Sequence, residues 1–99
     1  MVIRIVRLTI QQEQVAVFKN YFSTTQAQIR SFPGCKYVSL HHDANQPEVM
    51  ITFSKWESEN DLENYRNSDL FKTTWAKVKP LFSAAPSAFT MVEDISDLG

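Results

Sequence analysis

A few side chains in this sequence could stack on, polarise or exchange protons with a small molecule. Trp56 ends a segment rich in strand-forming residues, where its indole could stack on a planar substrate and aim its N–H at a carbonyl or at oxygen. Tyr65 lies on the apolar stripe of a helical segment and could present its hydroxyl to a pocket. Each could equally be a core residue whose polar atom is satisfied inside the protein.

His41 and His42 are candidates for proton transfer, because a histidine titrates near neutral pH. Adjacent residues of a strand point to opposite faces, so the pair cannot form one metal site. No nearby pattern of Asp, Glu or Cys completes such a site, and we expect no metal. The competing interpretation, which we favour, places both histidines at the surface near the end of a hairpin. Cys35 follows a turn and is expected to be a structural thiol.

Composition narrows the class of protein. Ninety-nine residues are enough for one domain, residues 1–99, and a single cysteine excludes an internal disulfide. The net charge is -1 with no run of Lys or Arg, which argues against a nucleic-acid partner. No apolar run approaches the roughly 20 residues of a membrane-spanning helix, so no membrane partner is expected. The first ten residues do not resemble a signal peptide, and we expect a cytoplasmic protein.

The elements that must position these side chains follow from periodicity. Residues Val2–Ile10 predict a strand, and an apolar stripe at helical spacing predicts a helix from about Gln12 to Phe32. Pro33 and Gly34 stop this helix. Two further strands, Lys36–Asp43 and Glu48–Trp56, are joined by a short turn-forming segment and form a hairpin.

The second half of the chain predicts helices and a last strand. Ser58 is a candidate N-cap for the second helix, and the segment Asn67-Ser68-Asp69 restarts it. The stripe that follows includes Phe71 and Trp75, and Arg66 is expected to face solvent. Ala85-Pro86 closes the helical region before a strand at Ser87–Ile95, and residues 95–99 are expected to form a frayed tail.

This order of elements predicts an α+β, ferredoxin-like β-α-β-β-α-β fold, with a four-stranded antiparallel sheet and helices on one face. The third strand is apolar on both faces: Ile51 and Phe53 lie on one, Met50 and Trp56 on the other. Helices cover only one of them, so we expect a homodimer through the sheet face. The alternative is a monomer whose open face would tend to aggregate.

Several segments follow one another in a specific order and spacing: Phe32-Pro33-Gly34-Cys35, Ile51 to Ser58, Leu62 to Tyr65, Ser68 and Leu70-Phe71. Together they resemble the antibiotic biosynthesis monooxygenase family. The resemblance spans nearly the whole chain. It implies a dimeric α+β barrel with a pocket between the sheet and the helices of each subunit. Members of this family oxidise electron-rich polycyclic phenols or quinols, degrade haem, or rearrange a signalling molecule, several of them without metal or flavin.

The resemblance also implies site residues. The strand face that carries Met50, Thr52 and Trp56 looks into the pocket in this family. Phe71 and Trp75, on the stripe of the last helix, are further candidates for substrate contact, and Trp75 either closes the pocket or fills it. Haem degradation is disfavoured, because Trp75 stands where that branch has its iron-binding histidine and Val6 stands where it has an asparagine. Thr52 replaces an asparagine of the branch that oxidises aromatic polyketides. Its hydroxyl can still donate a hydrogen bond, over a shorter reach.

Two functions remain open from the sequence. The first is a cofactor-independent monooxygenase for an electron-rich aromatic or quinol, with Trp56, Thr52, Tyr65 and one of the two histidines supplying stacking, donors and a base. The second is a non-catalytic dimeric module that binds a hydrophobic or aromatic small molecule or another protein. In that case Trp75 would fill the pocket. The sequence does not decide whether the chain is an enzyme.

Overall fold

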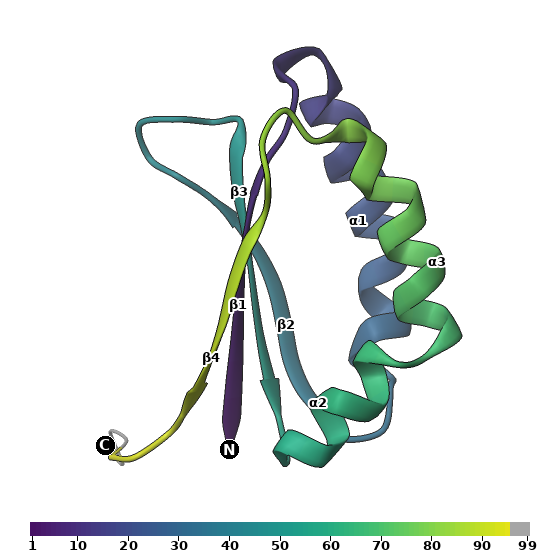
Figure 1. The fold of residues 1–99 in the computed structure, drawn as a ribbon, viewed down its shortest axis with the longest axis vertical. Helices are drawn as coiled ribbons and strands as arrows, with labels where there is room; N and C mark the ends of the chain where they lie inside the picture. Colours follow the sequence, from purple (N-terminus) through teal and green to yellow (C-terminus); the bar gives the residue numbers. More distant parts are fainter. Residues whose placement is uncertain (96–99) are drawn as a thin grey trace.

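The computed structural model describes residues 1–95, which form four β-strands and three α-helices (Figure 1). The strands are β1 (Val2–Thr9), β2 (Cys35–His42), β3 (Val49–Trp56) and β4 (Ser87–Val92). The α-helices are α1 (Val15–Arg30), α2 (Glu59–Arg66) and α3 (Asp69–Val78). Two short 3₁₀ segments, η1 (Gln12–Gln14) and η2 (Lys79–Leu81), adjoin α1 and α3.

The four strands form one antiparallel sheet in the order β2-β3-β1-β4. The hairpin between β2 and β3 turns at Asp43, whose carboxylate accepts the backbone N–H groups of Asn45 at 2.8 Å and Gln46 at 3.1 Å. This topology is the split β-α-β arrangement, and it confirms the predicted α+β, ferredoxin-like fold.

All three helices lie on the same face of the sheet (Figure 1). Side chains of a strand alternate between its faces, so the register that pairs Val6 with Thr52 fixes which residues the helices cover. On β1 and β3 these are Arg4, Val6, Leu8, Met50, Thr52, Ser54 and Trp56. The face predicted to look into a pocket is therefore the helix-covered face.

Two buried clusters fill the space between the sheet and the helices. One cluster contains Val2, Ile29, Cys35, Val38, Trp56 and Leu62. The other contains Leu8, Ile10, Phe18, Met50 and Val78. The first includes Leu62 of α2 and the second Val78 of α3, so burial of apolar area fixes both helices on the sheet.

The open face of the sheet is also largely apolar. Ile5 pairs with Phe53 on one side and with Phe89 on the other, so the three side chains form a row across β3, β1 and β4. Within one copy of the chain, Phe89 is 55% exposed, Met91 39% and Tyr37 47%. A single copy thus leaves a contiguous apolar surface in water.

Local capping fixes the start of α2 and of α3. The Ser58 hydroxyl oxygen accepts the Asp61 N–H at 3.1 Å, and the Ser68 hydroxyl oxygen accepts the Phe71 N–H at 3.1 Å. Gly34 lies against α2 with φ at 88°, and a Cβ there would lie 2.4 Å from Cγ of Asp61. Only glycine permits both this φ and this approach. The predicted N-cap and helix restart are confirmed.

The differences from prediction lie at element ends. Ile10 forms an isolated bridge with Phe82 outside β1. Gln12–Gln14 is a 3₁₀ turn ahead of α1, and its N-cap, Gln11, makes no side-chain capping bond. The last α-helix gives way to η2 around Pro80, which cannot donate a helical hydrogen bond. β4 ends at Val92 instead of Ile95. The expected tail beyond residue 95 lies outside the described residues.

Candidate functional site

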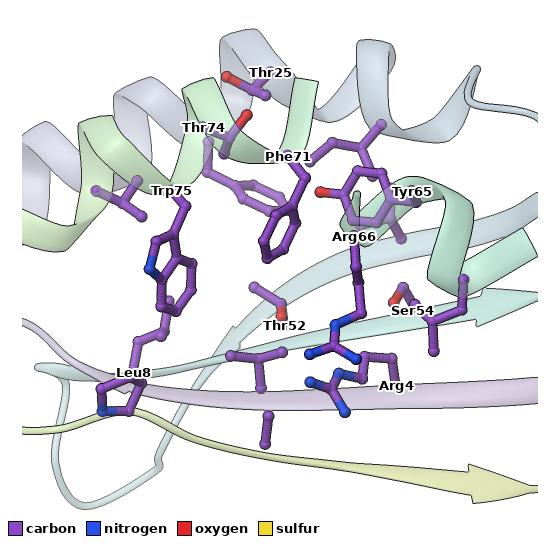
Figure 2. Close-up of a pocket in the computed structure, with 18 of the residues that line it drawn as sticks. Arg4, Leu8, Thr25, Thr52, Ser54, Tyr65, Arg66, Phe71, Thr74 and Trp75 are labelled. Atoms are coloured by element: carbon purple, nitrogen blue, oxygen red, sulfur yellow. The ribbon is translucent and has the colours of Figure 1, made fainter. Parts of the chain in front are cut away.

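A cavity of about 450 Å³ lies between the helix-covered face of the sheet and the three helices (Figure 2). Its lining comes from β1, β2, β3, α1, α2, α3 and the start of β4. Most of the lining side chains are apolar: Val6, Leu8, Phe18, Phe22, Ile29, Val38, Trp56, Leu62, Phe71, Trp75, Val78, Pro86 and Ala88. A small aromatic molecule would fit a space of this size and character.

A chain of aromatic rings runs along the cavity beneath α2 and α3. The Tyr65 ring stacks on Trp56 with centroids 4.8 Å apart, and Phe71 stacks on Trp75 with centroids 5.8 Å apart. Phe71 meets Tyr65 edge-on at 5.4 Å, which joins the two stacked pairs. Trp75 also meets Phe82 edge-on at 5.5 Å. Trp75 therefore forms a wall of an open cavity and does not fill it.

Trp56 is completely buried at the end of β3. Its indole N–H donates to the Ser54 hydroxyl oxygen at 3.0 Å. Ser54 lies two residues earlier on the same strand, so its side chain points to the same face. In this structure the indole N–H is satisfied internally, and Trp56 offers the cavity an aromatic surface instead of a free donor.

Tyr65 supplies a polar atom to this apolar space. Burial, and to a lesser degree the nearby Cys35, raises the pKa of its phenol to about 12. The group is therefore neutral at physiological pH and acts as a hydrogen-bond donor or acceptor. Its hydroxyl points toward the interior beside Phe71 (Figure 2), and no atom of residues 1–95 hydrogen-bonds to it.

Three threonines reach the cavity with different roles. The Thr25 hydroxyl donates to the Tyr21 carbonyl at 2.9 Å, within α1. Thr52 on β3 and Thr74 on α3 also line the cavity, and neither hydroxyl makes a hydrogen bond within the described part of the chain. Each can donate one hydrogen bond to a ligand. Thr52 and Tyr65 are thus two predicted site residues that the fold brings to one cavity with their hydroxyls available.

Two arginines lie together at one side of the cavity. Figure 2 shows Arg66 descending from α2 and Arg4 rising from β1, with their guanidinium groups facing each other. Burial, followed by the positive charge of Arg66, lowers the pKa of Arg4, while Glu63 acts in the opposite direction. Arg66 is exposed to solvent as the sequence predicted, yet it also borders the cavity.

The remaining predicted site residues lie elsewhere. His41 and His42 are exposed at the end of β2 and border a separate hollow between β2 and α1. The His41 Nε2 atom is 2.7 Å from the Ser39 hydroxyl oxygen, and the His42 Nδ1 atom is 3.1 Å from the Asp43 carbonyl oxygen. Met50 is fully buried and packs in the core beside Leu8. The structure brings none of these three to the cavity.

The cavity lining includes no Asp, Glu, His, Lys or Cys among the described residues. Its titratable groups are Tyr65 and the two arginines. Across residues 1–95, no three His, Cys, Asp or Glu side chains gather as a metal site would require. None of the helices there has the length and apolar character needed to cross a membrane.

A family model described as antibiotic biosynthesis monooxygenase matches residues 1–77. The chain belongs to this family. Among curated proteins, none matches the sequence. The matched residues include β1, the hairpin, α2 and nearly all of α3, which together carry most of the cavity of this family member.

Solved structures share the fold of this antibiotic biosynthesis monooxygenase family member. Protein Rv0793 from Mycobacterium tuberculosis has a TM-score of 0.86 and 16% identity, over 99% of this chain and 98% of that one. A proposed antibiotic biosynthesis monooxygenase from Nitrosomonas europaea has a TM-score of 0.85 and 14% identity, over 93% and 97% of the two chains. A further antibiotic biosynthesis monooxygenase has a TM-score of 0.85 and 15% identity, over 98% and 100%. At such identities the likeness establishes the fold alone.

Sequence reasoning missed Arg4 as a cavity residue. The sequence did contain an indication, because Arg4 is spaced two residues from Val6 and four from Leu8 and so lies on the same face of β1. Thr74 was missed as well, although it shares the face of α3 that carries Phe71 and Trp75. Both were overlooked because the sequence does not show how far α2 and α3 stand from the sheet.

Proposed function

We propose that this family member is a cofactor-independent monooxygenase that oxidises an electron-rich aromatic or quinol substrate in the cavity. The observation that carries the proposal is an open, aromatic-lined space of about 450 Å³ with free hydroxyl groups from Thr52 and Tyr65. The flat faces of Phe71 and Trp75 suit a planar ring system. The family assignment supports oxygen chemistry in this space.

The electrons for the reaction come from the substrate. In an anthrone, for example, loss of a proton gives an anion that can pass an electron to O₂. The ring CH₂ then becomes C=O, one oxygen atom of O₂ enters the product, and the other leaves as water with the two hydrogen atoms. In this balance O₂ takes the four electrons that the CH₂ group loses.

The protein's task is to bind the substrate, exclude water and stabilise its anion. A neutral Tyr65 can donate a hydrogen bond to an oxyanion, and Thr52 offers a second donor on β3. In an apolar cavity such bonds stabilise charge more strongly than in water. The burial of Trp56 and its bond to Ser54 hold the floor of the cavity rigid.

We further propose that the chain acts as a homodimer through the open face of the sheet. The row formed by Phe53, Ile5 and Phe89 is apolar and is continued by Met91 and Tyr37. Covering this surface with the same surface of a second copy would remove it from water in one symmetric contact. The proposal is supported by the exposed apolar area of the single chain.

Oxygen uptake tests the catalytic proposal. Wild-type protein is mixed with anthrone or with reduced 1,4-naphthoquinone in an oxygen electrode, and the products are analysed after reaction under ¹⁸O₂. We expect uptake above the uncatalysed rate and, with anthrone, one ¹⁸O atom in the product. Thr52→Val, which removes a hydroxyl at constant size, should lower the rate about tenfold or more. Thr73→Val on the exposed side of α3 is the matched control and should change it little.

The same experiment addresses the alternative, a non-catalytic binding module. The lack of a carboxylate or imidazole in the cavity lining favours that alternative over an enzyme with its own base. Calorimetric binding of the aromatic compounds with no oxygen uptake above the blank would establish the module and reject the monooxygenase.

A further inference from the structure

The arginine pair at the side of the cavity is a feature that the proposed reaction does not use. Arg4 lies on the helix-covered face of β1, and Arg66 is the last residue of α2. Figure 2 shows their guanidinium groups on the same side of the cavity, and the charge of Arg66 acts on Arg4. Two positive charges thereby lie at the edge of a cavity whose other lining residues carry no charge.

This arrangement leaves hydrogen-bonding capacity unused. One Arg4 nitrogen, Nη1, donates to the Thr90 hydroxyl oxygen at 2.9 Å, and no other side-chain bond of Arg4 forms within residues 1–95. Arg66 Nη1 lies 3.4 Å from Oε2 of Glu63, a pair that is mostly in solvent. A guanidinium carries five N–H donors, so most of the donors of the pair remain free.

The electrostatics also favour a third partner. Arg4 is partly withdrawn from water, and Arg66 repels it, while Glu63 offsets only one of the two charges. An anion between the two guanidiniums would relieve the repulsion and accept charge-assisted hydrogen bonds from both. Arginine suits carboxylates in particular, because its planar fork matches their two oxygens.

We propose that Arg4 and Arg66 form a clamp for a carboxylate, and that the ligand of this cavity is an aromatic carboxylic acid. Its rings would lie along Tyr65, Phe71 and Trp75, while its carboxylate would lie between the two guanidiniums. The inference rests on the proposed use of the cavity as a binding site, and it specifies the class of molecule that enters it. It does not require that the ligand be oxidised.

Two probes with the same rings and different charge test the clamp. Anthracene-9-carboxylate and the neutral 9-anthracenemethanol are titrated into the protein by isothermal calorimetry, without any turnover. We expect the carboxylate to bind at least about tenfold tighter, as charge-assisted hydrogen bonds imply. Arg4→Gln should weaken carboxylate binding about tenfold and alter alcohol binding less than about twofold. Arg66→Gln, at a more exposed site, should weaken it about threefold.

Two further variants separate the clamp from general charge. Glu63→Gln removes the carboxylate that competes for Arg66 and should tighten binding of the acid about two- to threefold. Lys72→Gln, at an exposed position on α3, makes the same change in net charge as the arginine variants and should have little effect. Thermal melts of all variants verify that they remain folded.

The inference is overturned if the two probes bind equally, if Arg4→Gln weakens both alike, or if neither binds at millimolar concentration. Its failure can be told apart from failure of the monooxygenase proposal. Oxygen uptake by the wild type together with equal binding of the two probes would reject the clamp and retain the enzyme. Selective binding of the carboxylate with no oxygen uptake on any substrate would retain the clamp and reject the monooxygenase.

Discussion

The Tyr65 ring stacks on the Trp56 indole, with centroids 4.8 Å apart and planes inclined by 26°. Trp56 ends β3 and Tyr65 lies in the last turn of α2, so the contact joins the end of a strand to a helix that begins three residues later. Phe32 touches both rings edge-on, at 6.3 Å and 5.4 Å. This three-ring contact fixes the height of α2 above the sheet, and with it one end of the cavity.

The hydrogen bond between Trp56 and Ser54 should appear as an energetic coupling. Ser54→Ala leaves a buried indole N–H without a partner and should lower the free energy of unfolding by about 1–3 kcal/mol. Trp56→Phe should cost about 2 kcal/mol through lost packing. The double variant should cost about 1 kcal/mol less than the sum, because the unpaired donor is gone. Urea unfolding followed by circular dichroism measures all three, and strict additivity would show that the bond contributes nothing.

Tyr65 should make the protein less stable at alkaline pH. The unfolded state ionises this phenol near pH 10, whereas burial raises the pKa in the folded state to about 12. The folded state therefore holds the proton more tightly, and the contribution is complete below pH 10 and lost between pH 10 and 12. The loss should be about 2–3 kcal/mol. The free energy of unfolding, measured with urea at a series of pH values, should not show this loss in Tyr65→Phe. The same dependence on pH between 10 and 12 in both proteins would contradict the assignment.

The proposed homodimer should depend on the apolar row of the open sheet face. Static light scattering of the wild type at micromolar concentration should give twice the chain mass of 11.4 kDa. Phe89→Ser removes a large apolar side chain that is 55% exposed in one copy, and it should shift the mass toward that of one chain. Val17→Ser on α1, 53% exposed and away from this face, is the control. A wild-type mass of one chain would refute the dimer.

Cys35 should be protected from thiol reagents in the native protein. It is buried in the cluster that contains Trp56, and burial raises the pKa of its thiol, so the reactive thiolate is scarce. Reaction with a chromogenic aromatic disulfide at pH 8 should be about 100-fold slower than in denaturant, because it requires local opening. Immediate reaction of the folded protein would instead indicate an accessible nucleophile.

The order of strands and helices could be predicted because each element carries its own signal. Ile3, Ile5 and Val6 mark β1 by composition, and Ser58 and Ser68 mark helix starts by capping chemistry. The predicted ends of strands and helices were less accurate, since tertiary contacts decide where an element stops. Ile10 continues the apolar pattern of β1, yet it pairs with Phe82 instead of extending the strand ladder.

The site could be predicted only in part. Thr52, Trp56, Tyr65, Phe71 and Trp75 all line the cavity, and strand alternation and helical spacing placed them on the correct faces. The histidines were candidates because of their chemistry alone, and sequence gives no measure of how far the end of β2 lies from the cavity. The hydrogen bond from the Trp56 N–H to Ser54 could not be predicted either, because it depends on the rotamers of both side chains.

The chemistry of the cavity wall has a consequence for how any reaction there would respond to acidity. Among the described residues that line it, none is a carboxylate, an imidazole or an amine, so none of these side chains can collect a proton from a bound molecule. That proton must pass to the surrounding water. The acid strength of the bound compound would then set the midpoint of the activity profile, which would move from one compound to the next while the protein stays the same.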